Sequence, residues 1–137
     1  MKNAFLPAVF VLLSCGGSST NGAPTITEQQ IQCLNKGKEY VQHSIEAGQQ
    51  VFYRKEEDIL LFHTPEGTTV GYLFEQGECS TVLTQFPASA KNQAEAFIAA
   101  EEKKNRGSLF ITKDNVQFKY YTAKQGGNEY LVAQSFN

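Results

Sequence analysis

The sequence predicts an α+β domain in which two helices pack on one face of an antiparallel, meandering sheet. Two stretches, 28–46 and 91–105, have the composition and spacing of amphipathic helices. Between and after them lie short runs rich in β-branched and aromatic residues, separated by turn-forming residues. The predicted order is one helix, four strands, one helix and three strands, which lacks the strand–helix–strand alternation of a parallel sheet.

The first helix is predicted over 28–46 because its start is well marked. Thr27 and Gln30 have the spacing of a capping box, and Ile26 and Ile31 that of a hydrophobic staple. Apolar residues then recur on one helical face. The second helix is expected to be capped by Ser89 or Asn92 and to end at Gly107.

The strands are predicted from apolar runs between turn residues. Turns are expected at the acidic stretch 56–58, at 65–67, at 76–78 and at the glycine pair within 125–128. In the strand that follows Asn115, alternate side chains are polar, which predicts one face turned to water. The predicted strands begin at 51 and cover 59–62, 69–74, 81–86, 109–112, 116–122 and 129–136.

A shift of 58 residues aligns the two halves of this pattern. Phe52 then matches Phe110, and Tyr72 with Leu73 matches Tyr130 with Leu131. Such matches fit an internal duplication. They also fit the general similarity of aromatic-rich hairpins, and the sequence leaves both interpretations open.

The amino-terminal segment has the pattern of an export signal. One basic residue, Lys2, precedes an apolar stretch from Ala4 to Leu13, which is too short to span a bilayer and contains Pro7. The stretch ends at Leu12-Leu13-Ser14-Cys15, followed by the glycine- and serine-rich residues 16–22. An ordinary secretory peptide cleaved near Ala23 would also fit this composition.

The segment Leu12 to Gly16 resembles the lipobox of bacterial lipoproteins, and the resemblance covers only the first fifteen or so residues. It implies removal of a signal peptide at 1–14 and attachment of membrane lipid (palmitate-type acyl chains) through Cys15, whose thiolate is the nucleophile. Residues 15–26 then form the lipidated end and a flexible tether, and 27–137 form the domain. With Gly16 in place of aspartate, enteric-type sorting implies an outer-membrane, periplasm-facing lipoprotein.

The composition limits the classes of partner that we expect the mature chain to bind. Without residues 1–14 it has eleven basic and fourteen acidic residues, a net charge of −3. This mild acidity argues against nucleic acid, which is bound by clustered lysine and arginine. We expect no nucleic-acid partner, no cofactor and no metal.

Cys33 and Cys79 are the two cysteines that remain once Cys15 carries lipid. Because exported proteins face an oxidising compartment, we predict a Cys33–Cys79 disulfide. Closing a loop of about 46 residues would stabilise the fold by on the order of 4 kcal/mol in the chain-entropy treatment. Two buried free thiols are the alternative, and no CxxC motif suggests redox catalysis.

No catalytic constellation is recognisable, so no catalytic residue is assigned. Glu39, His43 and Glu46 have a spacing that could hold a metal, but a solvated helix face explains them better. His63 ends a strand and is interpreted as a half-exposed strand residue. Tyrosine is common in protein interfaces, and Tyr121 and Tyr53 are the candidate interface residues. Tyr121 is the stronger candidate because it lies on the polar side of its strand.

The sequence therefore favours a lipid-anchored, non-catalytic binding or inhibitor module of the immunity or exclusion type, with a protein partner in the envelope. That preference is an analogy of size and anchor. One alternative is a structural accessory lipoprotein of a secretion, pilus or outer-membrane assembly complex. A second alternative is a small envelope hydrolase whose residues come from distant strands.

Overall fold

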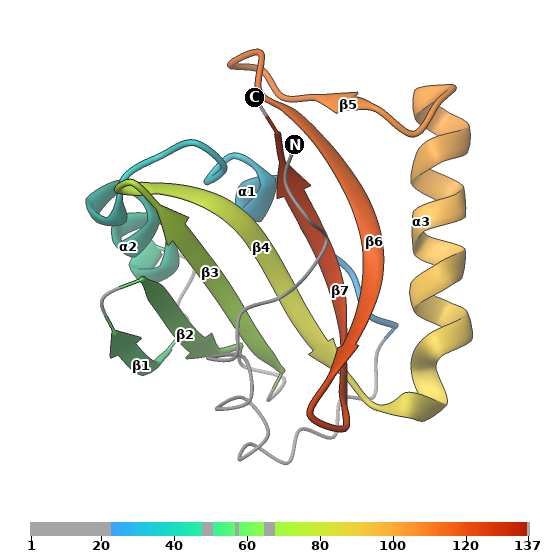
Figure 1. Ribbon diagram of the computed structural model, residues 1–137, viewed down its shortest axis with the longest axis horizontal. Coiled ribbons are helices and arrows are strands. Elements are labelled where there is room, and N and C mark those ends of the chain that lie inside the picture. Colours follow the sequence, from blue (N-terminus) through green and yellow to red (C-terminus); the bar gives the residue numbers. More distant parts are fainter. Residues whose placement is uncertain (1–22, 48–50, 57, 65–67, 137) are drawn as a thin grey trace.

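A computed structural model describes residues 23–47, 51–56, 58–64 and 68–136, with only the backbone described for 51–56. The α+β class is confirmed: helices and an antiparallel sheet share one buried core (Figure 1). The helical elements are α1 (Glu28–Ile31), α2 (Lys38–Ala47), the 3-10 turn η2 (Ala88–Ala90) and α3 (Lys91–Asn105). The strands are β1 (Val51–Glu56), β2 (Ile59–His63), β3 (Thr69–Glu75), β4 (Glu78–Phe86), β5 (Phe110–Ile111), β6 (Gln117–Gln125) and β7 (Asn128–Ser135).

The predicted single helix over 28–46 is wrong, because the structure divides it into α1 and α2. The capping box of Thr27 and Gln30 is present, with Gln30 N donating to Thr27 Oγ1 at 3.2 Å. The helix nevertheless ends after one turn, and Asn35 adopts a left-handed φ of 68°. Asn35 N donates to Cys79 O at 2.7 Å, and Cys79 N donates to Lys36 O at 2.8 Å. The connection therefore pairs with the start of β4 instead of continuing the helix.

Helix α3 has the predicted bounds but neither predicted cap. Its first turn follows directly from η2, and the N-cap is Ala90, with no side-chain hydrogen bond. At the other end Arg106 takes the left-handed conformation, with φ 62°, and Gly107 N donates to Glu102 O at 3.1 Å. The backbone therefore closes this end in the manner of a Schellman turn.

The sequence predicts an antiparallel meandering sheet but not the order in which its two runs of strands join. The strand order of the sheet is β1-β2-β3-β4-β7-β6-β5, with every neighbouring pair antiparallel. After β4 the chain runs through α3 to the far edge of the sheet, where β5 begins (Figure 1). The chain then returns by β6, so that β7 pairs with β4 in the middle. Two meanders therefore meet at the β4–β7 pair.

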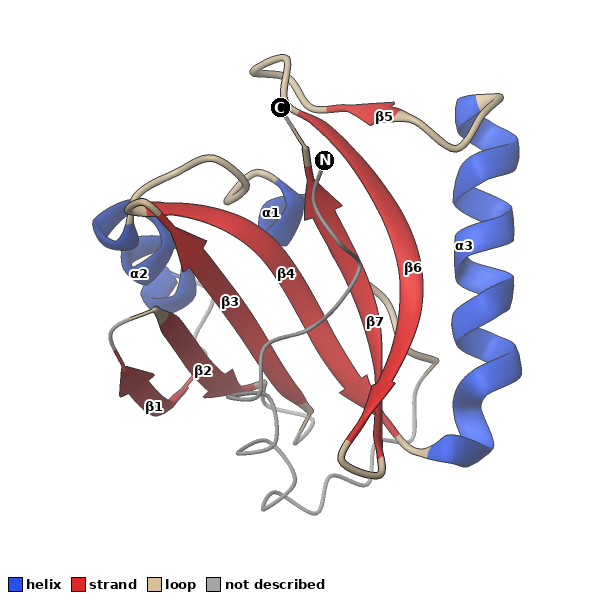
Figure 2. Cartoon of the chain, in the orientation of Figure 1, coloured by secondary structure: helices blue, strands red, loops and turns tan. Residues whose placement is uncertain are grey.

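All the helices lie against one face of the sheet, as the sequence predicts, and the main core fills the space between them. Leu34, Val41 and Ile45 from the first helical region and Ala94 from α3 belong to one buried cluster with the sheet. Phe97 and Ile98 of α3 pack against the same cluster. Figure 2 shows the opposite face of the sheet toward the viewer, with α1 and α2 behind it. The sheet residues of this core include Leu60, Phe62, Val70, Tyr72, Phe74, Val82, Phe86, Phe118 and Leu131.

The 58-residue repeat stays a prediction, and one of its matches does not describe equivalent positions. Tyr72 belongs to the helix-side core, whereas Tyr130 belongs to a second cluster on the opposite face. Side chains alternate between the two faces of the sheet along each strand. The shift of 58 residues aligns β2 residues with β6 residues on the same face, but it aligns β3 residues with β7 residues on the opposite face. The hairpin pairings differ in the same way: His63 pairs with Thr69, but Tyr121 pairs with Val132.

Candidate functional site

The predicted anchor lies outside the described residues. Cys15, the signal segment before it and most of the tether precede residue 23, where the description begins. Within the described residues, no helix combines the length and apolarity needed to cross a bilayer. Lipidation of Cys15 accordingly stays a prediction from the sequence.

The structure places Cys33 and Cys79 in the helix-side core, and neither has any exposed surface. Both are free thiols in this structure. Their chain segments lie side by side, because the backbone groups of Asn35 and Lys36 pair with Cys79. The predicted disulfide therefore joins two segments that the fold already brings together, but the bond itself stays a prediction.

Burial dominates the electrostatics of this pair. It raises the pKa of the Cys33 and Cys79 thiols, and the neighbouring Cys33 sulfur raises the pKa of Cys79 further. Burial also raises the pKa of Tyr72, with a smaller contribution from the two sulfurs. The thiols are thus held in their protonated, poorly nucleophilic form, which suits a structural role better than a catalytic one.

Of the two tyrosines predicted as interface residues, only Tyr121 has a described side chain. Tyr121 lies on β6 and is half-buried, packing against the second cluster, and its hydroxyl donates to Gln134 Oε1 at 2.8 Å. On the side of this strand that the sequence predicts to face water, Gln117 and Lys119 are exposed and Tyr121 is half-buried. The side chain of Tyr53, on β1, lies outside the described residues.

Among the described residues, the histidines and the carboxylates of α2 do not form a metal-binding cluster. Glu39, His43 and Glu46 are exposed on α2, and the described residues contain no group of three or more metal-binding side chains. His63 is half-buried, with Nδ1 3.3 Å from Thr69 Oγ1. No histidine lines either of two hollows in the described part of the chain, one at the hairpin between β3 and β4 and one between α1 and β5.

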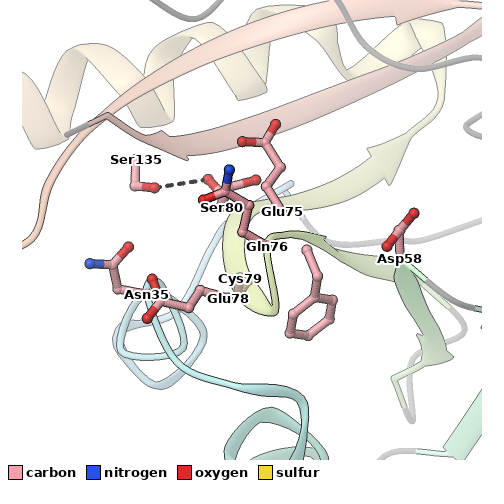
Figure 3. A pocket seen from close by; sticks show the side chains of 9 residues that line it. Asn35, Asp58, Glu75, Gln76, Glu78, Cys79, Ser80 and Ser135 are labelled. Carbon is pink, nitrogen blue, oxygen red and sulfur yellow. Dashed lines mark hydrogen bonds between the residues drawn. The ribbon is translucent and has the colours of Figure 1, made fainter.

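A polar hollow of about 700 Å³ lies at the end of the sheet where β2 begins, β3 ends and β4 starts (Figure 3). We call it the acidic hollow because three carboxylates line it: Asp58, Glu75 and Glu78. All three residues are exposed. The other residues that line it are Asn35, Phe74, Gln76, Cys79, Ser80 and Ser135.

The wall of this hollow is built from a tight hairpin. Glu75 pairs with Glu78, and the two residues between them, Gln76 and Gly77, have φ of 54° and 82°. Positive φ at both central residues defines the primed turn whose twist matches that of the strands, and Gly77 adopts it without steric strain. The turn therefore carries its two carboxylates in a fixed relation at the hairpin tip.

Hydrogen bonds to backbone carbonyl groups tie the neighbouring segments to this hairpin. Phe74 N donates to Asp58 O at 2.9 Å, which fixes the start of β2 against β3. Ser135 Oγ donates to Ser80 O at 3.2 Å, which joins the end of β7 to β4 (Figure 3). The acidic hollow is consequently part of the rigid sheet.

The chemistry of the acidic hollow is that of a hydrogen-bond acceptor. Its described lining contains carboxylates, amides and hydroxyls but no lysine, arginine or histidine. Carboxylates accept charge-assisted hydrogen bonds from ammonium and guanidinium groups, the latter often with two parallel bonds. The arrangement therefore suits a positively charged group on a ligand or partner.

Sequence reasoning did not identify this hollow. The stretch 56–58 and the turn at 76–78 are each recognisable as turns, but nothing in the sequence shows that they meet. They meet because β2 and β3 pair antiparallel, which brings Ile59, next to Asp58, opposite Leu73. The available signal was a turn with a carboxylate on each side, Glu75 and Glu78, next to a second acidic turn.

The fold and this site define an α+β domain with an acidic recess at one end of its sheet. No family model, curated protein or solved structure matches the chain.

Proposed function

We propose that the chain is a lipid-anchored envelope protein that acts as a non-catalytic binding or inhibitor module. The observation that carries the proposal is the acidic hollow, in which Asp58, Glu75 and Glu78 are exposed on a rigid hairpin end. An inhibitor works by presenting a preformed surface, since a surface that is already ordered loses little entropy on binding. A stiff, acceptor-rich recess meets that requirement.

The anchor is the second part of the proposal and depends on Cys15. Loss of residues 1–14 and acylation of Cys15 would leave a nine-residue tether, Gly16–Pro24, before the domain. Random-coil scaling gives this tether a reach of roughly 15–18 Å. Two or three acyl chains give stable attachment, because each buried methylene contributes about 0.8 kcal/mol and one chain alone is marginal. The proposed location is the periplasmic side of the outer membrane.

The third part is a disulfide between Cys33 and Cys79 in the exported protein. The proximity of their segments and the complete burial of both side chains support it. The bond would fix the α1–α2 connection, which lines the acidic hollow through Asn35, to β4. Its role is to stiffen the recess.

The anchor is tested by growing cells with an alkyne-labelled fatty acid. We expect the wild-type chain to carry the label and the Cys15→Ala variant to carry none, while a Ser14→Ala variant keeps it. Label that survives Cys15→Ala contradicts the anchor.

The binding role is tested by affinity capture. The bait is the mature chain, residues 15–137, with Cys15→Ala so that it stays in solution. We expect one dominant envelope protein in equal amount with the bait, and a reduced yield with Glu75→Gln/Glu78→Gln. Several components of one assembly would instead indicate a structural accessory, and no captured protein over a range of salt concentrations contradicts the proposal.

An internal duplication is retained as a proposal about the origin of the fold. The same succession of one helix and three strands, α2-β1-β2-β3 and α3-β5-β6-β7, supports it. The opposite faces of Tyr72 and Tyr130 require a changed hairpin register in one half.

A further inference from the structure

One edge of the molecule combines exposed apolar side chains with exposed basic ones. It lies where α3 ends, β5 follows and the chain turns back into β6 (Figure 1). Leu109 and Ile111 are exposed by 43% and 58%, and with Tyr40 they are the large apolar side chains exposed among the described residues. We call this edge the β5 surface. Its members, all exposed, are Lys103, Lys104, Arg106, Leu109, Ile111 and Lys113.

The backbone turns the two apolar side chains of this surface to the same side. Phe110, between them, pairs with Phe118 and is buried in the helix-side core. Side chains alternate along extended backbone, so Leu109 and Ile111 project to the side opposite Phe110. Because β5 is the last strand in the sheet order, no further strand of the described sheet covers it. The two side chains are therefore free to contact something outside the domain.

Basic side chains flank the apolar pair. Three nearby carboxylates have lysine partners: Glu101 with Lys104 at 3.0 Å, Glu28 with Lys113 at 3.9 Å and Asp114 with Lys36 at 2.5 Å. A fourth, Glu102, is half-buried. Lys103 and Arg106 are exposed and make no ion pair with another described residue. Two positive charges beside the apolar pair thus remain available to an anion.

The β5 surface lies where the proposed tether meets the domain. Ile26 lines a hollow of about 410 Å³ together with Ile111 and Lys113. The described residues begin at Ala23, so the chain enters the domain beside this surface. A nine-residue tether with a reach of roughly 15–18 Å therefore holds the β5 surface close to the bilayer that carries Cys15.

The size of the surface favours a bilayer over a protein as its occupant. A stable protein interface buries about 800 Å² on each partner and is enriched in aromatic residues. Two exposed aliphatic side chains offer much less. A tethered surface needs little intrinsic affinity, because a short linker gives an effective concentration on the order of millimolar. Aliphatic side chains beside long basic ones are also typical of protein surfaces that lie at the interface of anionic bilayers.

We propose that the β5 surface docks onto an anionic phospholipid bilayer. Leu109 and Ile111 enter the boundary between headgroups and acyl chains, and Lys103 and Arg106 contact lipid phosphate groups. The inference rests on the proposed anchor and adds the orientation of the domain, which lies with its β5 edge against the membrane.

The test uses an introduced tryptophan, because the chain has none of its own. The mature chain, residues 15–137, is coupled through the Cys15 thiol to a maleimide lipid in vesicles of phosphatidylethanolamine and phosphatidylglycerol. The other two cysteines are fully buried and do not compete. We expect Ile111→Trp to emit at shorter wavelength and to be quenched by brominated acyl chains. Lys124→Trp should show neither effect, because it lies on β6 roughly 24 Å beyond the residue opposite Ile111.

Charge variants in the Ile111→Trp background test the basic flank. Lys103→Gln/Arg106→Gln should lose quenching at low salt and change little at high salt, where charges are screened. The matched control, Lys91→Gln/Lys124→Gln, removes the same charge at the start of α3 and the end of β6. Quenching should be unchanged in this control, and an equal loss in both variants contradicts a specific contact.

Three results overturn the docking proposal. The first is an unquenched tryptophan in folded Ile111→Trp, with Leu109→Trp, the second reporter, unquenched as well. Equal quenching of Lys124→Trp shows that the domain has no preferred orientation. A captured partner that Ile111→Ser loses, without any quenching of Ile111→Trp, assigns the surface to a protein. Because the coupling to vesicles is chemical, these results are independent of the fatty-acid label, whose absence from the wild-type chain contradicts the anchor itself.

Discussion

The Tyr121 hydroxyl donates to Gln134 Oε1 at 2.8 Å, which joins β6 to β7 on the sheet face opposite the helices. Because Tyr121 is half-buried, this bond both satisfies its hydroxyl and holds the ring against the second buried cluster, which includes Leu83 and Val132.

Removal of that hydroxyl tests the bond. Tyr121→Phe keeps the ring and loses the donor, so we expect a decrease of about 1 kcal/mol in the free energy of unfolding. Urea denaturation monitored by circular dichroism measures it. Gln134→Ala should give a similar decrease, and the double variant little more than either single one. Fully additive losses would show that the two side chains do not interact.

Alkaline pH should destabilise the fold through its tyrosines. Burial raises the pKa of Tyr121 to about 12 and that of Tyr130 to about 12, against an ordinary value of 10. The unfolded chain therefore releases these protons first, so stability is complete below pH 10 and falls as the pH rises from 10 through 12. Denaturation midpoints measured across that interval should decline, and Tyr121→Phe should decline less steeply. An unchanged midpoint up to pH 12 argues against burial of these rings.

The thiol pair gives a prediction that depends on the compartment. Exported protein should contain no free thiol at Cys33 or Cys79, and its reduction should lower stability by up to about 4 kcal/mol. Protein made in a reducing cytosol should keep both thiols. Because burial raises their pKa, those thiols should react with a disulfide reagent only after denaturation. Free thiols in the exported chain, detected by mass spectrometry after alkylation, would falsify the disulfide.

Gly71 offers a prediction on packing. In Gly71→Ala the new methyl group meets the ends of Leu61 and Leu83, which must move by a few tenths of an ångström. Overpacking of this kind costs about 1–3 kcal/mol, and we expect the low end of that range because flexible side-chain ends absorb the shift. Thermal melting measures it. Gly107→Ala, where nothing lies within 4 Å of the added carbon, is the matched control.

Asn35 tests the break between the first two helices. Its φ of 68° favours glycine or asparagine, so Asn35→Gly should change stability little, whereas Asn35→Ala should lower it by about 1–2 kcal/mol. Both are measured by urea denaturation. If alanine were tolerated as well as glycine, with α1 and α2 joining into one helix, the left-handed turn would not be what ends α1.

Local signals in the sequence predicted most of the elements. The capping box at Thr27, the bounds of α3 and the turn at Gln76-Gly77 all depend on near neighbours, and each is present. The break after α1 was missed because the apolar spacing continues across it, and what ends the helix is a pairing with Cys79, far away in the chain.

The sheet order and the candidate site could not be predicted for the same reason. Strand composition does not specify whether β4 pairs with β5 or with β7, because the alternation of apolar side chains sets the buried face of a strand and not its neighbour. The acidic hollow, which Ser135 of β7 helps to line, and the second buried cluster follow from that choice of neighbours. The interface role of Tyr121 stays a prediction, and its intramolecular partner Gln134 belongs to a strand pairing that only the fold reveals.

The position of β7 has a consequence for the order in which the chain acquires its structure. Its contacts with β4, such as Thr81 opposite Gln134, join the two meanders, and β7 is the final strand along the chain. The halves therefore cannot dock until β7 itself has been synthesised. Such long-range closure slows folding; under the export proposed above, a slow-folding precursor would remain threadable through a secretion pore for longer.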